Sequence, residues 1–174
     1  MTIDFLKYSD LLARSESSNN PKAVNNIGAL GLFQFLPKTL NSLQSLYNLP
    51  AWKNESNFLN NVELQKTYLR ALVTDTLNFI RSNNLDRYLN TLVIGSKKYP
   101  GLKANLNTYG MLAIAHLGGS ANLKKFLESG GVFNPNYGVN SLSDYASYFS
   151  SKLSSSSSIQ VLLAFIPGIV LYYL

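Results

Sequence analysis

Apolar residues recur at helical spacing along almost the whole chain, and this periodicity limits the fold more than any other feature. Leu64, Tyr68 and Leu72 follow one another at four-residue steps, which predicts a long helix over residues 62–81 with a wide buried face. A similar pattern over residues 85–93 predicts a second, shorter helix. Alternation typical of strands is short throughout, and a small hairpin is considered only around residues 23–29. The sequence therefore predicts a mainly α fold, and it contains no internal repeat.

Glycines and helix caps divide the second half of the chain into further helices. An apolar run over residues 111–117 stops at two consecutive glycines, which suits a helix end. Ser120 is expected to cap the next helix, which should end at the following pair of glycines. Ser141, followed three positions later by Asp144, matches a capping box that opens a last helix.

The composition excludes several kinds of site. The 174 residues include no cysteine and one histidine, so a disulfide framework, a thiolate zinc site and a multi-histidine metal site are not expected. Lys and Arg number 15 against 9 acidic residues, and this net charge of +6 favours a polyanionic partner. The basic residues are scattered as singles and pairs, without an interleaved aromatic stripe, so nucleic acid is not the expected partner. No metal and no cofactor are predicted.

The two ends of the chain differ in composition. The first residues contain Asp4 and no long apolar run, so no secretory signal is expected there. Residues 154–158 are all serine, which predicts a flexible linker, and residues 159–174 carry no charge. A helix over residues 159–174 would span about 24 Å, which is short of the roughly 30 Å hydrocarbon core of a bilayer. We expect this hydrophobic tail to anchor the protein in a lipid membrane; the alternative is a buried terminal helix.

One carboxylate stands between an apolar helix and a polar loop near the start of the chain. Apolar side chains between Ile3 and Leu12 predict a helix that ends at about Ser15, which leaves Glu16 at its carboxyl end. The helix dipole there disfavours the ionised form of an acid, and apolar residues within 30–35 would disfavour it further if they covered the site. A carboxyl group that keeps its proton can serve as a general acid.

The segment that begins at Glu16 carries an ordered series of short motifs. Glu16 and two serines are followed by Asn-Pro at 20–21, Ala-Val at 23–24, Gly-Ala-Leu-Gly-Leu-Phe-Gln at 28–34, and then Pro37 and Thr39. This order resembles the signature of the soluble lytic transglycosylases and goose-type lysozymes. In that family the pattern reads Glu-Ser, Asn-Pro, Ala-Val, Gly-Ala-x-Gly-Leu-Met-Gln and Pro-x-Thr.

The resemblance implies a lysozyme-like helical domain over residues 1–153 that cleaves the bond between N-acetylmuramic acid and N-acetylglucosamine in peptidoglycan. It implies that Glu16 is the catalytic acid and base. Ser17 and Gln34 would contact the substrate, and Gly28 and Gly31 would let the backbone pass close to the glycan. The second carboxylate of ordinary glycosidases is not evident, and the family uses the neighbouring acetamido group of the sugar instead.

A second block departs from the pattern of the wider family. Where the family has Ala-Tyr-Asn-Ala-Gly, this chain has Ala-His-Leu-Gly-Gly at residues 115–119. This block is similar to a variant found in phage-encoded wall-degrading proteins, which also share the Asn-Pro and Ser-Leu-Ser-Asp-Tyr motifs present within residues 134–145. The resemblance implies that Tyr145 hydrogen-bonds the catalytic glutamate. His116 has two interpretations, a substrate contact or a hydrogen-bonded core histidine.

The predicted function is therefore that of a phage virion protein that opens the bacterial cell wall as a lytic transglycosylase. Its predicted partners are peptidoglycan, a lipid membrane and other virion proteins. Two alternatives stay open: a hydrolytic lysozyme of the goose type, and a structural virion membrane protein that binds glycan with an inactive lysozyme fold. Trp52 also has two interpretations, a platform for the glycan or a packed anchor of its loop.

Overall fold

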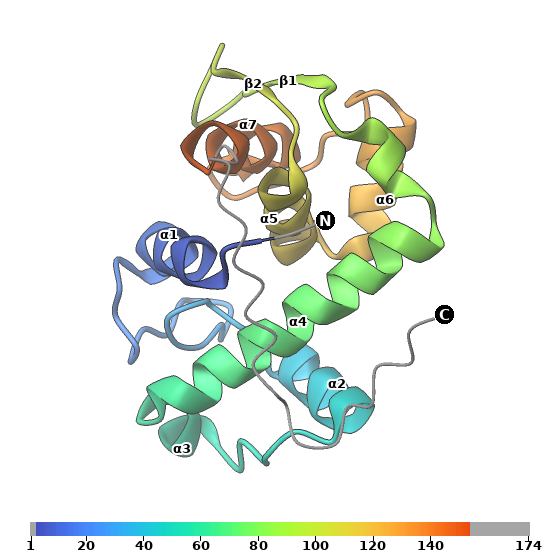
Figure 1. Ribbon diagram of the computed structural model, residues 1–174. Helices are drawn as coiled ribbons and strands as arrows, with labels where there is room; N and C mark the ends of the chain where they lie inside the picture. The colour runs from blue at the N-terminus through green and yellow to red at the C-terminus, as the bar shows by residue number, and fades with distance from the viewer. Residues whose placement is uncertain (1–2, 154–174) are drawn as a thin grey trace. The chain divides into compact units, whose positions relative to one another are not determined.

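The structure is a computed structural model that describes residues 3–153 (Figure 1). It is mainly helical, as the periodicity predicts, with seven α-helices in the described part of the chain. These residues form two compact units, an N-terminal unit of residues 4–72 and a C-terminal unit of residues 73–153 that also includes Ile3. The predicted serine linker and hydrophobic tail, residues 154–174, lie outside the described residues. Within residues 3–153, no helix combines the length and the apolar character that crossing a bilayer requires.

The N-terminal unit contains α1 (Phe5–Ser17), α2 (Pro37–Tyr47), the short α3 (Glu55–Leu59) and the first half of α4 (Val62–Ser82). Asp4 precedes α1 as its N-cap, and its side chain accepts the backbone N–H of Lys7. Four aromatic rings pack edge to face in the core of this unit. Their centroids lie 5.8–6.3 Å apart in the order Phe33, Phe35, Phe58, Tyr68.

Trp52 joins this aromatic cluster from the loop between α2 and α3. Its ring lies edge-on to Phe58 at a centroid distance of 6.3 Å, and its indole N–H donates to the Asn41 side chain of α2 at 2.9 Å. Both contacts lie within the N-terminal unit. They favour the interpretation of Trp52 as a packed anchor of its loop.

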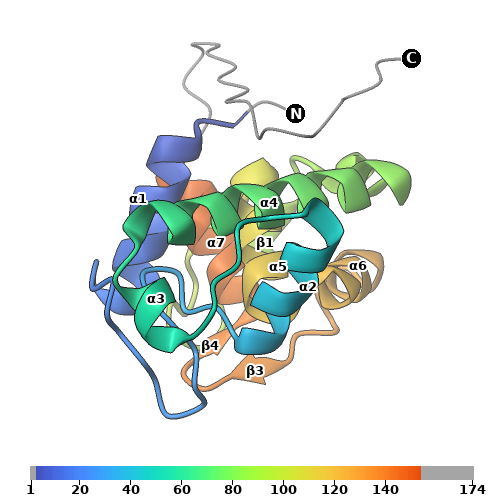
Figure 2. The same cartoon turned by 90° about the horizontal axis from the view of Figure 1, so that it is seen from below.

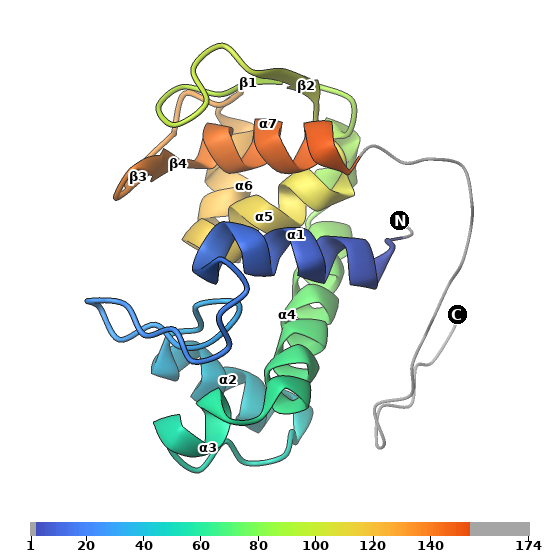
Figure 3. The same ribbon diagram turned by 90° about the vertical axis from the view of Figure 1, so that its left-hand side faces the viewer.

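The C-terminal unit combines helices with two small antiparallel sheets (Figures 1 and 2). After α4 come a 3-10 turn, η1 (Leu85–Tyr88), and the pair β1 (Leu92–Ile94) and β2 (Lys103–Asn105), in which Val93 opposes Ala104. Then follow α5 (Thr108–Gly118), α6 (Ser120–Glu128), the pair β3 (Asn136–Tyr137) and β4 (Asn140–Ser141), and α7 (Leu142–Lys152). Helix α7 packs against α5 and against the β1–β2 pair (Figure 3).

Two predictions about local structure are wrong. Residues 85–93 do not form one helix, because Asn90 has a left-handed backbone with φ of 67° and Leu92 begins a strand. The β-branched residues that follow pair with residues 103–105, a partner that helical periodicity within the segment does not reveal. Ser120 does not cap α6 with its side chain; it is the first residue of the helix, and Gly119 precedes it as the cap.

Helix α7 begins with the predicted capping box. The Ser141 hydroxyl accepts the backbone N–H of Asp144, and the Asp144 carboxylate accepts the backbone N–H of Ser141 at 2.9 Å. The same carboxylate also accepts the backbone N–H groups of four consecutive residues, 96–99, at 3.0–3.1 Å. Asp144 therefore holds the β1–β2 connection against the start of α7, which local sequence spacing does not indicate.

Candidate active site

Glu16 lies in the last turn of α1 and is half-buried. The helix ends at Ser17, because Ser18 and Asn19 take left-handed backbone angles and donate their N–H groups back to the carbonyl oxygens of Arg14 and Ala13. The structure thus places Glu16 at the carboxyl end of a helix, as predicted. At this end the partial negative charge of the helix dipole faces the carboxyl group.

The charge of Glu16 acts on Tyr8, a residue in the interior of the N-terminal unit. Tyr8 lies two turns earlier on α1 and is almost fully buried. Burial, and next the negative charge of Glu16, raise the pKa of the Tyr8 phenol far above its ordinary value. Tyr8 therefore stays neutral over the working range of pH and adds no second charge near Glu16.

The motif at residues 28–34 forms a tight double turn beside α1 (Figure 3). Leu30 bridges to both Val24 and Phe35, and its backbone N–H and C=O pair with those of Phe35 at 2.9 and 3.0 Å. The Asn25 side chain accepts the N–H groups of residues 27 and 29, which closes the first turn. The expected hairpin around residues 23–29 is thus present as isolated bridges rather than as regular strands.

Gly28 and Gly31 both lie where a left-handed backbone is required, with φ of 77° and 75°. Gly28 has open space where a Cβ would stand. A Cβ on Gly31 would instead collide with the side-chain amide of Gln65 from α4. Backbone conformation and the contact with Gln65 therefore already explain a glycine at position 31. The predicted approach of Gly31 to the glycan stays a prediction.

Ser17 and Gln34 are both engaged with the backbone of this loop. The Ser17 hydroxyl lies 3.0 Å from the carbonyl oxygen of Leu32 and 3.1 Å from that of Ala13, and it accepts the N–H of Asn20. The Gln34 side chain donates to the carbonyl oxygen of Gly31 at 2.9 Å. These contacts tie the end of α1 to the loop. The predicted contacts of Ser17 and Gln34 with substrate stay predictions.

His116 and Tyr145 belong to the C-terminal unit. His116 lies in the last turn of α5 and is partly buried, whereas Tyr145 lies in α7, is 3% exposed and packs against Phe149. Glu16 belongs to the N-terminal unit. The predicted hydrogen bond from Tyr145 to Glu16 and the two interpretations of His116 therefore stay predictions.

Asp144, the neighbour of Tyr145, is fully buried and ionised. Burial opposes its charge, but hydrogen bonds from the Ser141 hydroxyl and from the backbone of residues 97–99 outweigh burial and lower the pKa to about 2. An acid that is ionised and fully hydrogen-bonded in this way is a poor proton donor near neutral pH. Asp144 is therefore a structural carboxylate and not the second catalytic carboxylate that ordinary glycosidases have.

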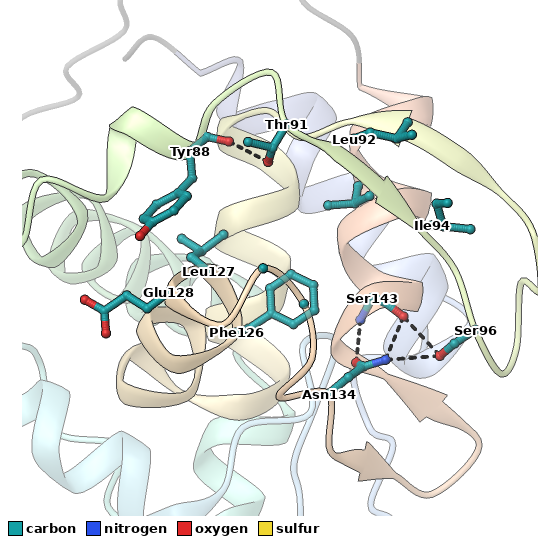
Figure 4. Close-up of a pocket in the computed structure, with 13 residues that line it drawn as sticks. Tyr88, Thr91, Leu92, Ile94, Ser96, Phe126, Leu127, Glu128, Asn134 and Ser143 are labelled. Atoms are coloured by element: carbon teal, nitrogen blue, oxygen red, sulfur yellow. Dashed lines mark hydrogen bonds between the residues drawn. The ribbon is translucent and has the colours of Figure 1, made fainter.

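A pocket of about 550 Å³ lies within the C-terminal unit, between β1, the end of α6 and the loop that follows it (Figure 4). Its apolar part includes Leu92, Phe126 and Leu127. At its polar end Ser96, Asn134 and Ser143 hydrogen-bond one another, so their donors are already used. None of the predicted site residues lines this pocket.

Comparison with known proteins decides the family. Residues 8–93 match the family model described as the transglycosylase SLT domain. Residues 8–93 are thus a transglycosylase SLT domain. The predicted resemblance of this segment to the transglycosylase family is confirmed. The resemblance to a phage-encoded variant stays a prediction.

The chain is similar to one solved structure, that of the 70 kDa soluble lytic transglycosylase from Escherichia coli. The two share 17% identity with a TM-score of 0.49, and the alignment covers 72% of this chain and 16% of that chain. The aligned part is a small share of the length of the larger protein. No curated protein sequence matches it significantly.

The SLT match contains Glu16, Ser17, Gly28, Gly31 and Gln34. It ends before His116 and Tyr145, whose roles rest on the motif resemblance alone. It also contains Gln65, which belongs to none of the motifs. The sequence does mark this residue, because Gln65 is a polar residue on the apolar stripe of the long α4 helix.

Proposed function

We propose that this protein cleaves the glycosidic bond between N-acetylmuramic acid and N-acetylglucosamine in peptidoglycan, with Glu16 as the catalytic acid and base. The observation that carries the proposal is the half-buried Glu16 at the end of α1, tied through Ser17 to the loop of residues 28–34 inside an SLT domain. The positive net charge supports it, since the wall polymer is rich in carboxylates.

The other acids of the N-terminal unit do not supply a second catalytic carboxylate. Asp4 caps α1, Asp10 and Glu55 are exposed, and Glu63 forms an exposed ion pair with Lys66 at 2.9 Å. An oxocarbenium-like sugar therefore needs stabilisation from another source. The acetamido group of the muramic sugar can provide it from within the substrate.

The reaction proceeds in two steps. Glu16 first donates its proton to the bridging oxygen, the C1–O4 bond breaks, and the acetamido oxygen bonds to C1. The Glu16 carboxylate then removes the proton of the muramic 6-hydroxyl, whose oxygen attacks C1 and displaces the acetamido group. The product is a 1,6-anhydro sugar, no water is consumed, and Glu16 regains its proton.

A hydrolytic lysozyme is the second candidate, in which Glu16 activates water instead of the 6-hydroxyl. The two outcomes differ in mass, because an anhydro end is lighter than a reducing end by one water. Mass spectrometry of the released fragments therefore distinguishes them. The family match favours the anhydro product.

The test of the proposal is the substitution Glu16→Gln, which keeps the shape of the side chain and removes its acid. We expect the wild-type chain to clear a suspension of peptidoglycan, and the variant to lose at least about 100-fold in rate, because general acid–base catalysis contributes 10²–10⁴-fold. Asp10→Asn on the exposed side of α1 is the matched control and should clear at the wild-type rate. Wild-type clearing by a folded Glu16→Gln variant would overturn the assignment.

We also propose that the enzyme is a phage virion protein that acts on the host cell wall and is held at a membrane by its hydrophobic tail. The resemblance of residues 115–119 to phage wall-degrading proteins supports the first part. The absence of charge in residues 159–174 supports the second. A virion protein with the same fold and without activity is the structural alternative, and the Glu16→Gln experiment separates it from an enzyme.

A further inference from the structure

We propose that Gln65 is a positioning residue for the reaction: it holds the loop of residues 28–34 in register with the end of α1 that carries Glu16. The inference rests on the proposed function, because positioning has meaning only if Glu16 is the catalytic acid. It is drawn from contacts within the N-terminal unit.

The Gln65 side chain is fully buried, and its amide is fully hydrogen-bonded. Its oxygen accepts the backbone N–H of Leu32 at 2.7 Å. Its nitrogen donates to the carbonyl oxygens of Phe58 at 2.9 Å and Pro21 at 3.1 Å. One side chain of α4 thus holds three separate stretches of backbone, the two ends of the loop after α1 and the end of α3.

The position of this amide is unusual for its helix. Gln65 shares the buried face of α4 with Tyr68 and Leu69, both fully buried. A buried amide without partners would cost about 1–3 kcal/mol, so a glutamine is tolerated on this face only because the loop satisfies it. The fit is also steric, since a Cβ on Gly31 would collide with the Gln65 amide.

The link to Glu16 runs through a single residue of the loop. Gln65 binds the N–H of Leu32, and the Ser17 hydroxyl, next to Glu16, lies 3.0 Å from the carbonyl oxygen of the same residue. Leu32 is therefore held from α4 on one side and from the end of α1 on the other. Removing the Gln65 contact would therefore release one of these two sides. A shift of about 1 Å in a substrate-positioning element can cost about 100-fold in rate.

The test uses two substitutions in the full chain. Gln65→Met keeps the length of the side chain and removes the hydrogen bonds of its amide without introducing a charge. We expect a folded variant whose kcat falls about 10-fold to 100-fold while KM changes less, because the catalytic geometry is altered more than the binding surface. A folded Gln65→Met enzyme with wild-type kcat would overturn the inference.

Gln65→Glu adds a pH readout that a purely structural loss would not produce. The introduced carboxyl group can accept from Leu32 but can donate to Phe58 or Pro21 only when protonated, and burial raises the pKa of such a group. We expect the ratio of variant to wild-type kcat to rise as the pH falls, measured where circular dichroism shows both proteins folded. Gln44→Glu, a partly exposed glutamine of α2, is the control and should give a ratio independent of pH. A flat ratio for Gln65→Glu would contradict the inference.

Amide hydrogen exchange separates a failure of this inference from a failure of the proposed function. We expect faster exchange at residues 28–34 in Gln65→Met than in the wild type, because the Leu32 N–H loses its acceptor. Unchanged exchange there overturns the role of Gln65 even if the wild type is active. A wild-type chain that does not clear peptidoglycan overturns the proposed function, and with it the positioning role in catalysis, whatever the exchange shows.

Discussion

Gly28 and Gly31 share a left-handed backbone but differ in what surrounds them. Their φ angles are 77° and 75°, yet only Gly31 faces the buried amide of Gln65. In the sequence they are equivalent glycines of one motif. Their different surroundings mean that substitution should affect stability by different amounts.

Gly31→Ala should therefore destabilise the protein more than Gly28→Ala. Each alanine costs about 1–2 kcal/mol for the left-handed backbone. At Gly31 the new methyl group also displaces Gln65 from its buried hydrogen bonds, which adds about 1–3 kcal/mol. Urea denaturation of the two variants measures the difference. Equal losses would show that Gln65 yields without cost, contrary to the packing described.

The start of helix α7 is stabilised by groups that are distant in sequence. The capping box joins Ser141 and Asp144, while the N–H groups of residues 96–99 come from the β1–β2 connection. Tyr99 of this connection also stacks on Tyr148 of α7, with ring centroids 4.7 Å apart. The first strand pair and the last helix are thus joined through one buried carboxylate.

Asp144→Asn should lower the free energy of unfolding by about 2 kcal/mol near neutral pH, since charge-assisted hydrogen bonds are the stronger ones. The pKa of Asp144 is lowered to about 2 in the folded protein. Its stabilising effect is therefore complete above the unfolded pKa of roughly 4 and is lost as the pH falls toward 2.

The measurement is denaturation of wild type and Asp144→Asn between pH 2 and pH 7. The two curves should run parallel above about pH 5 and converge below about pH 4. Asp86→Asn, an exposed acid of η1, is the control and should change stability little at any pH. A gap between wild type and Asp144→Asn that persists at pH 2 would show that the ionised carboxylate is not the stabilising group.

At the scale of the whole molecule, the chain combines a charged and a charge-free part. All 15 basic and 9 acidic residues precede residue 154, and residues 159–174 are uncharged. Such a division suits a protein whose catalytic part works in water while its end enters lipid. The membrane association proposed above depends on this tail.

Replacing Leu162 and Ile169 of the tail by lysine should abolish membrane association. Each lysine placed centrally in a bilayer costs about 2.5–3.5 kcal/mol on insertion scales. In a flotation assay with liposomes, we expect the wild-type chain to float and the double variant to remain at the bottom, with equal clearing of peptidoglycan. Co-flotation of both proteins would show that another surface binds the lipid.

The sequence alone determined the helical class, the long helix over residues 62–81, the capping box of α7 and the place of Glu16 at a helix end. Each of these depends on spacing within a few turns, which helical geometry converts directly into position. Only the tertiary structure decided three other features. These are the strand pairing of residues 92–94, the hydrogen bonds from residues 96–99 to Asp144, and the contact of Gln65 with Leu32. They join residues 9 to 48 positions apart, and the chain must fold before such groups meet.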